Sequence, residues 1–411
     1  MVKRYERSLA QNALTLLASH GLGAVLSFVI MAWLGRGLGA DGLGRYGALL
    51  AWVTVLVLLS ELGLGTLTLR QVARTPHETR PYVWHVLRLR LLVSAGAVLA
   101  FLGLGVAVGG ELVLWLWCAP MVAILPVYGV FSAVFRALER MAWVALLNVG
   151  MLLAQVGLLA VLDAQGTLTL ERALIVNTFT SLAQLGVAVG LYGAVVVRHL
   201  PTAVVAYDVR DLLRQALPFA IASALGALQA RLAIVLLEQS TSAHVVGFFV
   251  VALRYVDVVR LFPMAYYDAL FPRVAHSQTV EALGRTFRRA LLTMGAYGVV
   301  ASVVLAWGSP FAVWLVLGQF APVSIDTLTV FAVGVVPLCL RGVLSLFCYA
   351  LDGEAVANRV SLITLAALMV SVLGFGAAAR AEWLAWALVW GDMLACALLW
   401  VNRPPVLRLA R

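Results

Sequence analysis

The sequence predicts an all-α membrane protein with about twelve transmembrane helices in two six-helix lobes. Composition is the first reason, because 63% of the 411 residues are hydrophobic and only 12% are charged, about half the charged share of a soluble protein. The second reason is a series of long apolar runs, and the third is a glycine-aromatic pattern that recurs half a chain later. No segment is polar enough to form a separate soluble domain.

Twelve apolar runs have about the length of 20 residues that a helix needs to cross a bilayer. The predicted spans are 9–34, 43–67, 87–108, 112–135, 142–162, 173–197, 212–237, 245–270, 290–307, 327–350, 355–378 and 383–401. The first run is too long for the apolar core of a signal peptide, so we expect it to be retained as a helix. The longest outer loop is expected at 308–326, where Phe311 and Trp314 suggest an interfacial segment.

The basic residues alternate from loop to loop along the chain. Loops on the side of the N-terminus carry 21 arginines and lysines, with large groups in 70–90 and 273–289, whereas the opposite side carries four. Positive charge collects on the cytoplasmic side of a membrane, so we expect both termini in the cytoplasm. This distribution also accounts for the net charge of +10 without nucleic acid, and no nucleic-acid partner is predicted.

An internal repeat relates the two halves. A shift of about 203 residues brings Gly44-Arg45-Tyr46 onto Gly247-Phe248-Phe249. Six spans precede the shift point, so both halves insert in the same orientation, and we expect lobes at 1–205 and 206–411. Such repeats place a transport site near the bilayer midplane, at the interface of the lobes. Gly44 and Gly247 are expected where helix backbones approach closely.

Several other classes of site are excluded by simple observations. Lys3 is the only lysine, which removes a Schiff-base lysine and a P-loop from the membrane body. The segment from Gly37 to Gly42 matches G-x-G-x-x-G, but it follows a membrane helix rather than a strand, so it predicts a tight turn and no nucleotide site. The cysteines lie inside apolar runs and are expected to be small buried residues; they are Cys118, Cys339, Cys348 and Cys396. No cofactor and no metal are predicted.

Ionisable residues inside the spans are the candidate functional residues. A charge in the hydrocarbon region is costly, so it faces a cavity or a partner and indicates function by default. The intramembrane arginines are Arg231, Arg254, Arg260 and Arg341, and the acids are Glu61, Glu238, Asp257, Asp268 and Asp392. We predict that the arginines bind an anionic group. Glu61, Glu238, Asp257 and Asp392 are predicted to pair charges or to couple transport to an ion.

Three of these arginines form a predicted ladder across the second lobe. At a rise of 1.5 Å per residue, Arg231 lies ~9 Å, Arg254 ~14 Å and Arg260 ~22 Å from the outer ends of their spans. Asp257 is three residues from both Arg254 and Arg260, so local pairing is the alternative. One aspartate neutralises one arginine and leaves about two positive charges, and span two offers no matching base. The second lobe is therefore expected to be the cationic one.

A cationic cleft in an apolar bundle suits an anion with a lipid tail, such as a polyprenyl-diphosphate-linked oligosaccharide. Arginine forks match phosphate oxygens, while the lipid tail stays in the bilayer. Polar residues on spans one, five and six either contact sugar or hydrogen-bond between helices, which is the commoner role; they are Asn12, Asn148, Gln155, Asn177 and Gln184. The basic loops at 70–90 and 273–289 either anchor the protein by the positive-inside rule or admit the diphosphate.

Several motifs together resemble a known family. The segment from Ala32 to Tyr46 resembles A-R-x-L-G-x-x-x-x-G-x-Y, and Ser60-Glu-Leu-Gly-Leu64 resembles D-x-G-L, with Glu61 in place of aspartate. In the second half, Val246-Gly-Phe-Phe249 and Ala269-Leu-Phe-Pro272 resemble V-G-x-Y and A-L-F-P, with Phe249 in place of tyrosine. The chain is thus similar to bacterial polysaccharide and O-antigen repeat-unit flippases of the multidrug/oligosaccharidyl-lipid/polysaccharide (MOP) exporter superfamily, whose fold is MATE-like.

The resemblance implies a flippase in the bacterial inner membrane that moves a lipid-linked oligosaccharide outward by alternating access. It implies the lipid bilayer as surroundings and a polysaccharide polymerase and other assembly proteins as partners, and no enzymatic activity. A cation-coupled multidrug exporter is one alternative, although it would favour acids over arginines in its cleft. A membrane-embedded polymerase or glycosyltransferase is another, which the short outer loops disfavour. An accessory subunit without transport is the last.

Overall fold

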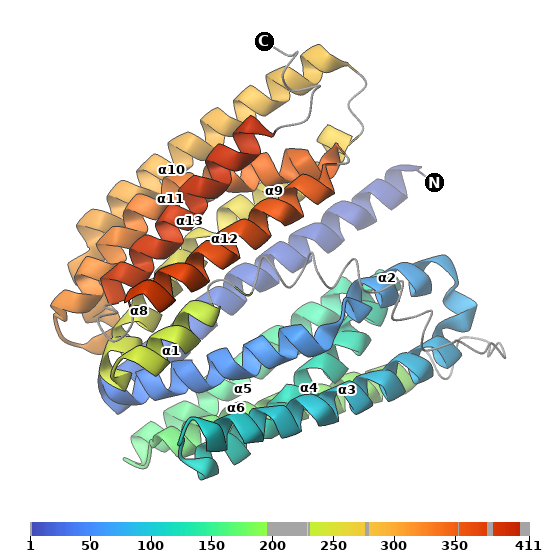
Figure 1. The fold of residues 1–411 in the computed structure, drawn as a ribbon. Coiled ribbons are helices and arrows are strands. Elements are labelled where there is room, and N and C mark those ends of the chain that lie inside the picture. Colours follow the sequence, from blue (N-terminus) through green and yellow to red (C-terminus); the bar gives the residue numbers. More distant parts are fainter. Residues whose placement is uncertain are drawn as a thin grey trace. The chain divides into compact units, whose positions relative to one another are not determined.

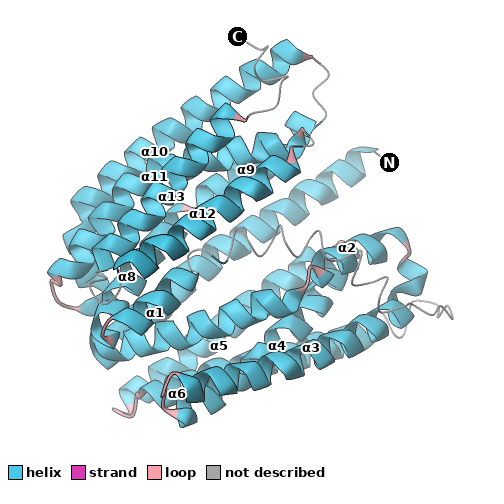
Figure 2. Cartoon of the chain, in the orientation of Figure 1, coloured by secondary structure: helices cyan, strands magenta, loops and turns pink. Residues whose placement is uncertain are grey.

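The structure is a computed structural model that describes residues 2–194, 228, 231–275, 279–351, 353–375 and 381–402. Side chains are described from Ala18 onward in these ranges, except those of 268–269, 272–273, 275 and 372–375. The described residues form helices and short connections, with no strand among them (Figure 2). Nine helices in these ranges are long and apolar enough to cross a membrane.

The chain divides into two compact units, of which the first comprises Met1–Leu38 and Leu49–Arg231. Its helices are α1 (Val2–Glu61, apart from the part in the second unit), α2 (Leu64–Arg74), the short 3₁₀ helix η1 (Pro76–Glu78), α3 (Thr79–Ala107), α4 (Leu112–Ala137), α5 (Met141–Ala164) and α6 (Leu170–Tyr192). Helix α4 is central, because α2, α3, α5 and α6 all pack against it.

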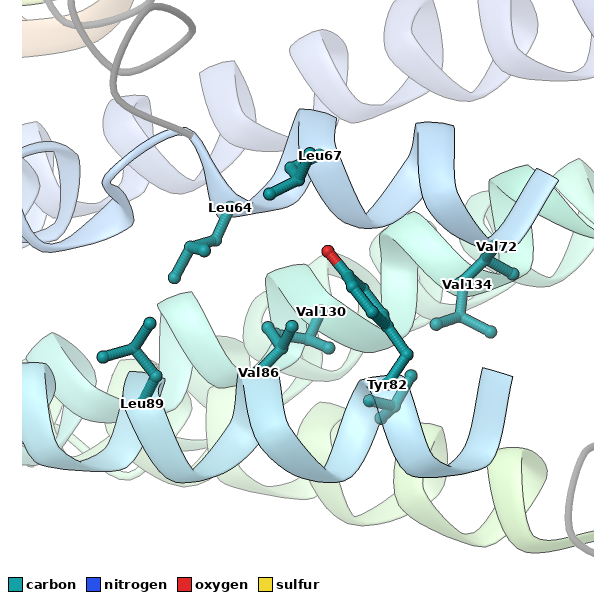
Figure 3. Packing of buried hydrophobic residues seen from close by; sticks show 9 residues of the cluster. Leu64, Leu67, Val72, Tyr82, Val86, Leu89, Val130 and Val134 are labelled. Carbon is teal, nitrogen blue, oxygen red and sulfur yellow. The ribbon is translucent and has the colours of Figure 1, made fainter. Parts of the chain in front are cut away.

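A hydrophobic cluster joins α2, α3 and α4 at one end of the first unit (Figure 3). Its members are Leu64, Leu67, Val72, Tyr82, Val83, Val86, Leu89, Val130 and Val134. In α2 the apolar residues recur at helical spacing, which gives this short helix one buried face. The cluster therefore extends the helical packing of the unit beyond the predicted end of the second span at residue 67.

The second unit comprises Gly39–Ala48 and Leu232–Arg411. Residues 231–240 are helical, and the further helices are α8 (Ala243–Val259), α9 (Leu261–Ala275), α10 (Val280–Leu317), α11 (Pro322–Ala350), α12 (Glu354–Phe375) and α13 (Ala381–Val401). Helix α11 is central and packs against α8, α9, α10, α12 and α13. In chain order α11 corresponds to α4, so the same neighbour pattern recurs in both halves, as a repeat requires. The predicted boundary between residues 205 and 206 lies outside the described residues and stays a prediction.

A sharp bend in α1 separates the first two predicted spans (Figure 1). Gly39 has φ 68° and ψ −176°, in a region where only glycine is comfortable, and it interrupts an otherwise continuous helix. The glycine-rich segment from Gly37 to Gly42 is therefore a turn between two helices, as predicted, and the turn is confined to one residue.

Gly44 and Gly247 lie where the segment after this bend crosses α8. A Cβ added to Gly44 would overlap the carbonyl oxygen of Ala243, and one added to Gly247 would overlap that of Ala40. Gly44 and Gly247 are 203 residues apart, and so are Ala40 and Ala243. The two halves of the repeat therefore make equivalent contacts with each other, and the close backbone approach expected of both glycines is present.

Two expectations about loops were wrong. The predicted outer loop at 308–326 is helical apart from residues 318–321, because α10 continues to Leu317 and α11 begins at Pro322. The predicted basic loop at 70–90 is also mostly helix, with only the connection and short 3₁₀ turn at 75–78 between α2 and α3. Hydropathy underestimates the length of these helices. Their ends carry charged residues or prolines, which lower the hydropathy, although one face of each helix stays buried.

Two prolines sit in helical segments because a hydroxyl replaces their missing N–H group. Pro263 cannot donate to the carbonyl of Val259, and the Tyr297 hydroxyl donates to that oxygen instead (2.7 Å). Pro310 likewise leaves the carbonyl of Ala306 without its helical donor, and the Ser309 hydroxyl donates to it (2.9 Å). Backbone groups at membrane depth need such internal partners, so these hydroxyls stabilise the break between α8 and α9 and the long α10.

Candidate functional site

Three charged side chains lie on one stripe toward the C-terminal end of helix α8, with Arg260 directly after its last residue. The Asp257 carboxylate lies 3.7 Å from the guanidinium of Arg254 and 3.8 Å from that of Arg260. The three side chains are 27%, 28% and 35% exposed in the order Arg254, Asp257, Arg260. One carboxylate thus lies between two arginines on a partly accessible face of the second unit.

The group extends from the second half of α8 to the residue after its C-terminal end. Helix α8 begins at Ala243, so Arg254 lies ~17 Å and Arg260 ~26 Å along the helix, against a hydrocarbon thickness of about 30 Å. Arg260 occupies the joint between α8 and α9, and its buried Nε has no hydrogen-bond partner among the described residues. This nitrogen is a donor available to an anionic ligand.

Arg341 and Asp392 form a separate pair between α11 and α13. The guanidinium donates to the carboxylate at 2.6 Å, and the side chains are only 17% and 15% exposed. The pair is balanced in charge and more buried than the group on α8. It is an ion pair that connects two helices, in which the carboxylate neutralises the guanidinium.

The first unit contains a buried arginine that the charge count had assigned to the cytoplasmic segment 70–90. Arg90 is fully buried in α3, 3.9 Å from the carboxylate of Glu61, and it donates to the carbonyl oxygen of Ser60 (3.4 Å). Gly65 makes room for this carboxylate, since a Cβ there would lie 2.8 Å from it. Span two itself contributes no base beyond Arg45, as expected, and the base that meets Glu61 comes from α3 instead.

A periodicity argument would have found Arg90. Tyr82, Val86, Leu89 and Arg90 follow one another at helical spacing, and all four are buried in the structure. The charge count concealed this, because it treated residues 70–90 as a solvated segment. Arg90 contacts Ser60 and Glu61 at the C-terminal end of α1. The next two residues, Leu62 and Gly63, have positive φ values and separate α1 from α2.

The remaining predicted site residues are less informative. Arg231 and Glu238 are partly buried on the helix at 231–240, and Arg231 belongs to the first unit while Arg254 and Arg260 belong to the second. The predicted ladder of three arginines therefore stays a prediction. The side chain of Asp268 lies outside the described residues.

Polar residues of the first unit hydrogen-bond between helices. The Asn148 side-chain oxygen accepts from the Tyr128 hydroxyl (2.7 Å) and from the Gln184 amide (2.9 Å), which links α5 to α4 and α6. Gln155 and Asn177 are buried as well. For Asn148 and Gln184 the structure therefore shows the commoner of the two predicted roles. Asn12 lies where side chains are not described.

Similar solved structures share this fold over nearly the whole chain. A lipid II flippase, MurJ, in an inward closed conformation matches with TM-score 0.80 and 10% identity, over 95% of this chain and 87% of that one. An inward-facing multidrug resistance MATE transporter of the MOP superfamily matches with TM-score 0.73 and 15% identity, over 95% and 97%. A MOP superfamily transporter from Pyrococcus furiosus, described as having a binding pocket of reverse polarity, matches with TM-score 0.67 and 13% identity, over 98% and 96%.

The predicted all-α, MATE-like fold is confirmed by these likenesses, which at such identities concern the fold alone. No curated protein matches the sequence. Residues 9–278 match the profile of a family described as "Polysaccharide biosynthesis protein", and this match spans most of the chain. The protein is a multi-pass membrane protein, and it belongs to the polysaccharide biosynthesis protein family with the fold of the MOP transporters.

Proposed function

We propose that this protein is a flippase that carries a polyprenyl-diphosphate-linked oligosaccharide across the membrane by alternating access. The observation that carries the proposal is the charged group on α8, where Arg254 and Arg260 share a single carboxylate. Membership of a polysaccharide biosynthesis family supports it, because lipid-linked repeat units must cross a membrane before they are polymerised outside.

The chemistry of the group suits a diphosphate. Arginine presents a planar fork of donors that matches phosphate oxygens, and it keeps its charge at any physiological pH. Asp257 lies within 4 Å of both guanidinium groups, so it orients them and offsets part of their cost in the membrane. An arriving diphosphate would accept a hydrogen bond from the unpaired Nε of Arg260.

The other intramembrane charges receive different roles. We assign the pair of Arg341 and Asp392 to helix packing, because its charges are balanced at 2.6 Å. Arg231, Glu61 and Glu238 remain candidates for cargo contact or ion coupling. The proposal places the protein in the bacterial inner membrane with both termini in the cytoplasm, working beside a polymerase and without catalytic activity of its own.

Arginine substitutions on α8 test the proposal. Each charge-assisted hydrogen bond contributes ~1.5–3 kcal/mol, so Arg254→Ala and Arg260→Ala are each expected to weaken cargo binding by roughly tenfold to a hundredfold. Arg254→Lys keeps the charge but loses the fork, and it is expected to lie between wild type and Arg254→Ala. The measurement is cell-surface polymer in complemented cells, with lipid-linked repeat units assayed in parallel.

The expected result is less surface polymer and more unflipped lipid-linked units, with normal amounts of protein in the membrane. Arg359→Ala is the matched control, because Arg359 is an exposed arginine of α12. Normal polymer in the double alanine variant, with lost resistance to a cationic drug, would replace the flippase with the multidrug exporter. Accumulation of flipped but unpolymerised units would indicate that this protein is a polymerase rather than a flippase.

A further inference from the structure

Two arginines at one end of the first unit lie over tryptophan rings. The Arg88 guanidinium carbon is 4.8 Å from the ring centroid of Trp84 on α3, and that of Arg140 is 5.1 Å from the ring centroid of Trp143 on α5. Trp84 is 55% exposed, Trp143 is partly buried, and both arginines are exposed. Each stack therefore presents an indole together with guanidinium donors on the surface of the unit.

The two stacks lie at the same height in the bundle. From Trp84 to the end of α3 at Ala107 the helix rises ~34 Å, and from Trp143 to the end of α5 at Ala164 it rises ~32 Å. Both values are close to the hydrocarbon thickness of about 30 Å. Leu87, between Trp84 and Arg88, packs on the same hydrophobic cluster as Trp143, so both stacks lie at the same end of the first unit. We name Trp84, Arg88, Arg140 and Trp143 the stacked rim.

The charge around the stacked rim is strongly positive. Exposed arginines at this end are Arg70, Arg74, Arg80, Arg88, Arg136 and Arg140, against the acids Glu78 and Glu139. The connections at the other end of α3–α6 carry Glu111, Asp163 and Glu171 and a single arginine, Arg172. The connections at the two ends of α3–α6 therefore differ in charge, basic beside the stacked rim and acidic at the other end, with one bilayer thickness of apolar helix between them.

We propose that the stacked rim binds the headgroups of anionic phospholipids. Indole rings favour the boundary between acyl chains and headgroups, and an arginine held flat on a ring keeps its edge donors free for a lipid phosphate. Stacking also holds the long arginine side chain before the lipid arrives, so little freedom is lost on binding. The positive rim complements an anionic headgroup and offers nothing comparable to a zwitterionic one.

The stacked rim belongs to the first unit, whereas the charged group on α8 belongs to the second. The proposal does not rest on the flippase function. It predicts that anionic lipid binds at the stacked rim whether the protein is a flippase or a multidrug exporter.

Native mass spectrometry of the purified protein, titrated with phosphatidylglycerol or phosphatidylcholine in a neutral detergent, measures binding of individual lipids. Wild type is expected to bind the first phosphatidylglycerol molecules more tightly than phosphatidylcholine, and higher salt is expected to reduce the difference. In Arg88→Gln/Arg140→Gln, phosphatidylglycerol binding is expected to weaken about fivefold for each arginine removed. Trp84→Leu/Trp143→Leu keeps both charges and should weaken it less.

Arg36→Gln/Arg172→Gln is the matched control, since it removes two exposed arginines elsewhere in the first unit. Arg88→Lys/Arg140→Lys serves if the glutamine variant does not fold, and its loss should exceed that of the control but stay below the loss expected of the glutamine variant, because lysine keeps the charge and lacks the fork. Equal affinity of wild type for both lipids, or equal losses in rim and control variants, would overturn the proposal. So would displacement of phosphatidylglycerol by equimolar polyprenyl diphosphate, which would make the rim a cargo site.

Discussion

Charged side chains inside the described helices occur in three arrangements that differ in balance and burial. Arg341 and Asp392 form a one-to-one ion pair and are mostly buried. In contrast, two arginines flank the carboxylate of Asp257, and all three of these side chains are partly exposed. Arg90 is fully buried, while its partner Glu61 is 39% exposed. The energetic role of each charge follows from these differences, because an unpaired charge costs more where water cannot reach it.

The pair of Glu61 and Arg90 should respond asymmetrically to substitution. Glu61→Gln leaves a fully buried guanidinium without its carboxylate, and breaking a buried pair in this way costs about 3–5 kcal/mol. Arg90→Met leaves only a partly exposed carboxylate and should cost less. The thermal midpoint of the purified protein is therefore expected in the order wild type, Arg90→Met, Glu61→Gln. A double variant as unstable as Glu61→Gln alone would show that the arginine charge is not the cause.

A second comparison separates packing from transport. Asp392→Asn is expected to lower the thermal midpoint more than Asp257→Asn, because its ion pair is shorter and less exposed. Asp257→Asn is expected to impair polymer export with less effect on stability. Partial recovery in the charge swap Arg341→Asp/Asp392→Arg would support direct pairing. The reverse order of stability, with normal export in Asp257→Asn, would contradict both assignments.

At the scale of helices, close backbone contacts and helix breaks decide the arrangement. Gly44 and Gly247 let α1 and α8 cross with carbonyl oxygens in the space that side chains would fill. The hydroxyl of Tyr297 satisfies the carbonyl that Pro263 leaves open, so α8 can end and α9 begin within the bundle. These devices are local in the sequence but act on a neighbouring helix.

Alanine substitutions test the crossing. Gly44→Ala and Gly247→Ala should each destabilise the protein by at least the ~1–3 kcal/mol typical of overpacking, because the added Cβ meets backbone that cannot rotate away. Gly96→Ala on α3 is the control, since nothing lies within 4 Å of its added Cβ, and it should be neutral or slightly stabilising. Thermal midpoints of the three purified variants provide the comparison. Wild-type stability of both crossing variants would mean that the helices do not approach this closely.

At the scale of the whole molecule, the asymmetry of basic residues predicts which ends of the helices share a side. Cysteines introduced at positions 80 and 285 are expected to react only from the cytoplasm, and those at 109, 240 and 319 only from outside. The measurement is labelling by a membrane-impermeant maleimide in intact and opened cells, in a variant without native cysteines. Labelling of position 80 from outside would reverse the orientation and remove the basis for outward transport.

The likeness of the two halves could be predicted in part. The shift of 203 residues came from a few glycine and aromatic positions, and the structure shows equivalent contacts of Gly44 with Ala243 and of Gly247 with Ala40. The central positions of α4 and α11 were not predicted. Which helix is surrounded by the others depends on how apolar faces meet, and in membrane helices those faces differ little in hydropathy from the lipid-facing ones.

The sequence by itself determined the fold class and the placement of Arg254, Asp257, Arg341 and Asp392 within apolar helices, because apolar length and charge placement act along the chain and can be counted residue by residue. Only the tertiary structure decided that Arg90 is buried against Glu61, that Arg341 meets Asp392, and that α10 continues past Pro310. For Arg90 and Arg341 the deciding partner is a carboxylate on another helix. For Pro310 it is the Ser309 hydroxyl, which donates to the carbonyl oxygen of Ala306. Such partners are invisible to hydropathy, since the cost of a charge or an open carbonyl depends on what faces it in three dimensions.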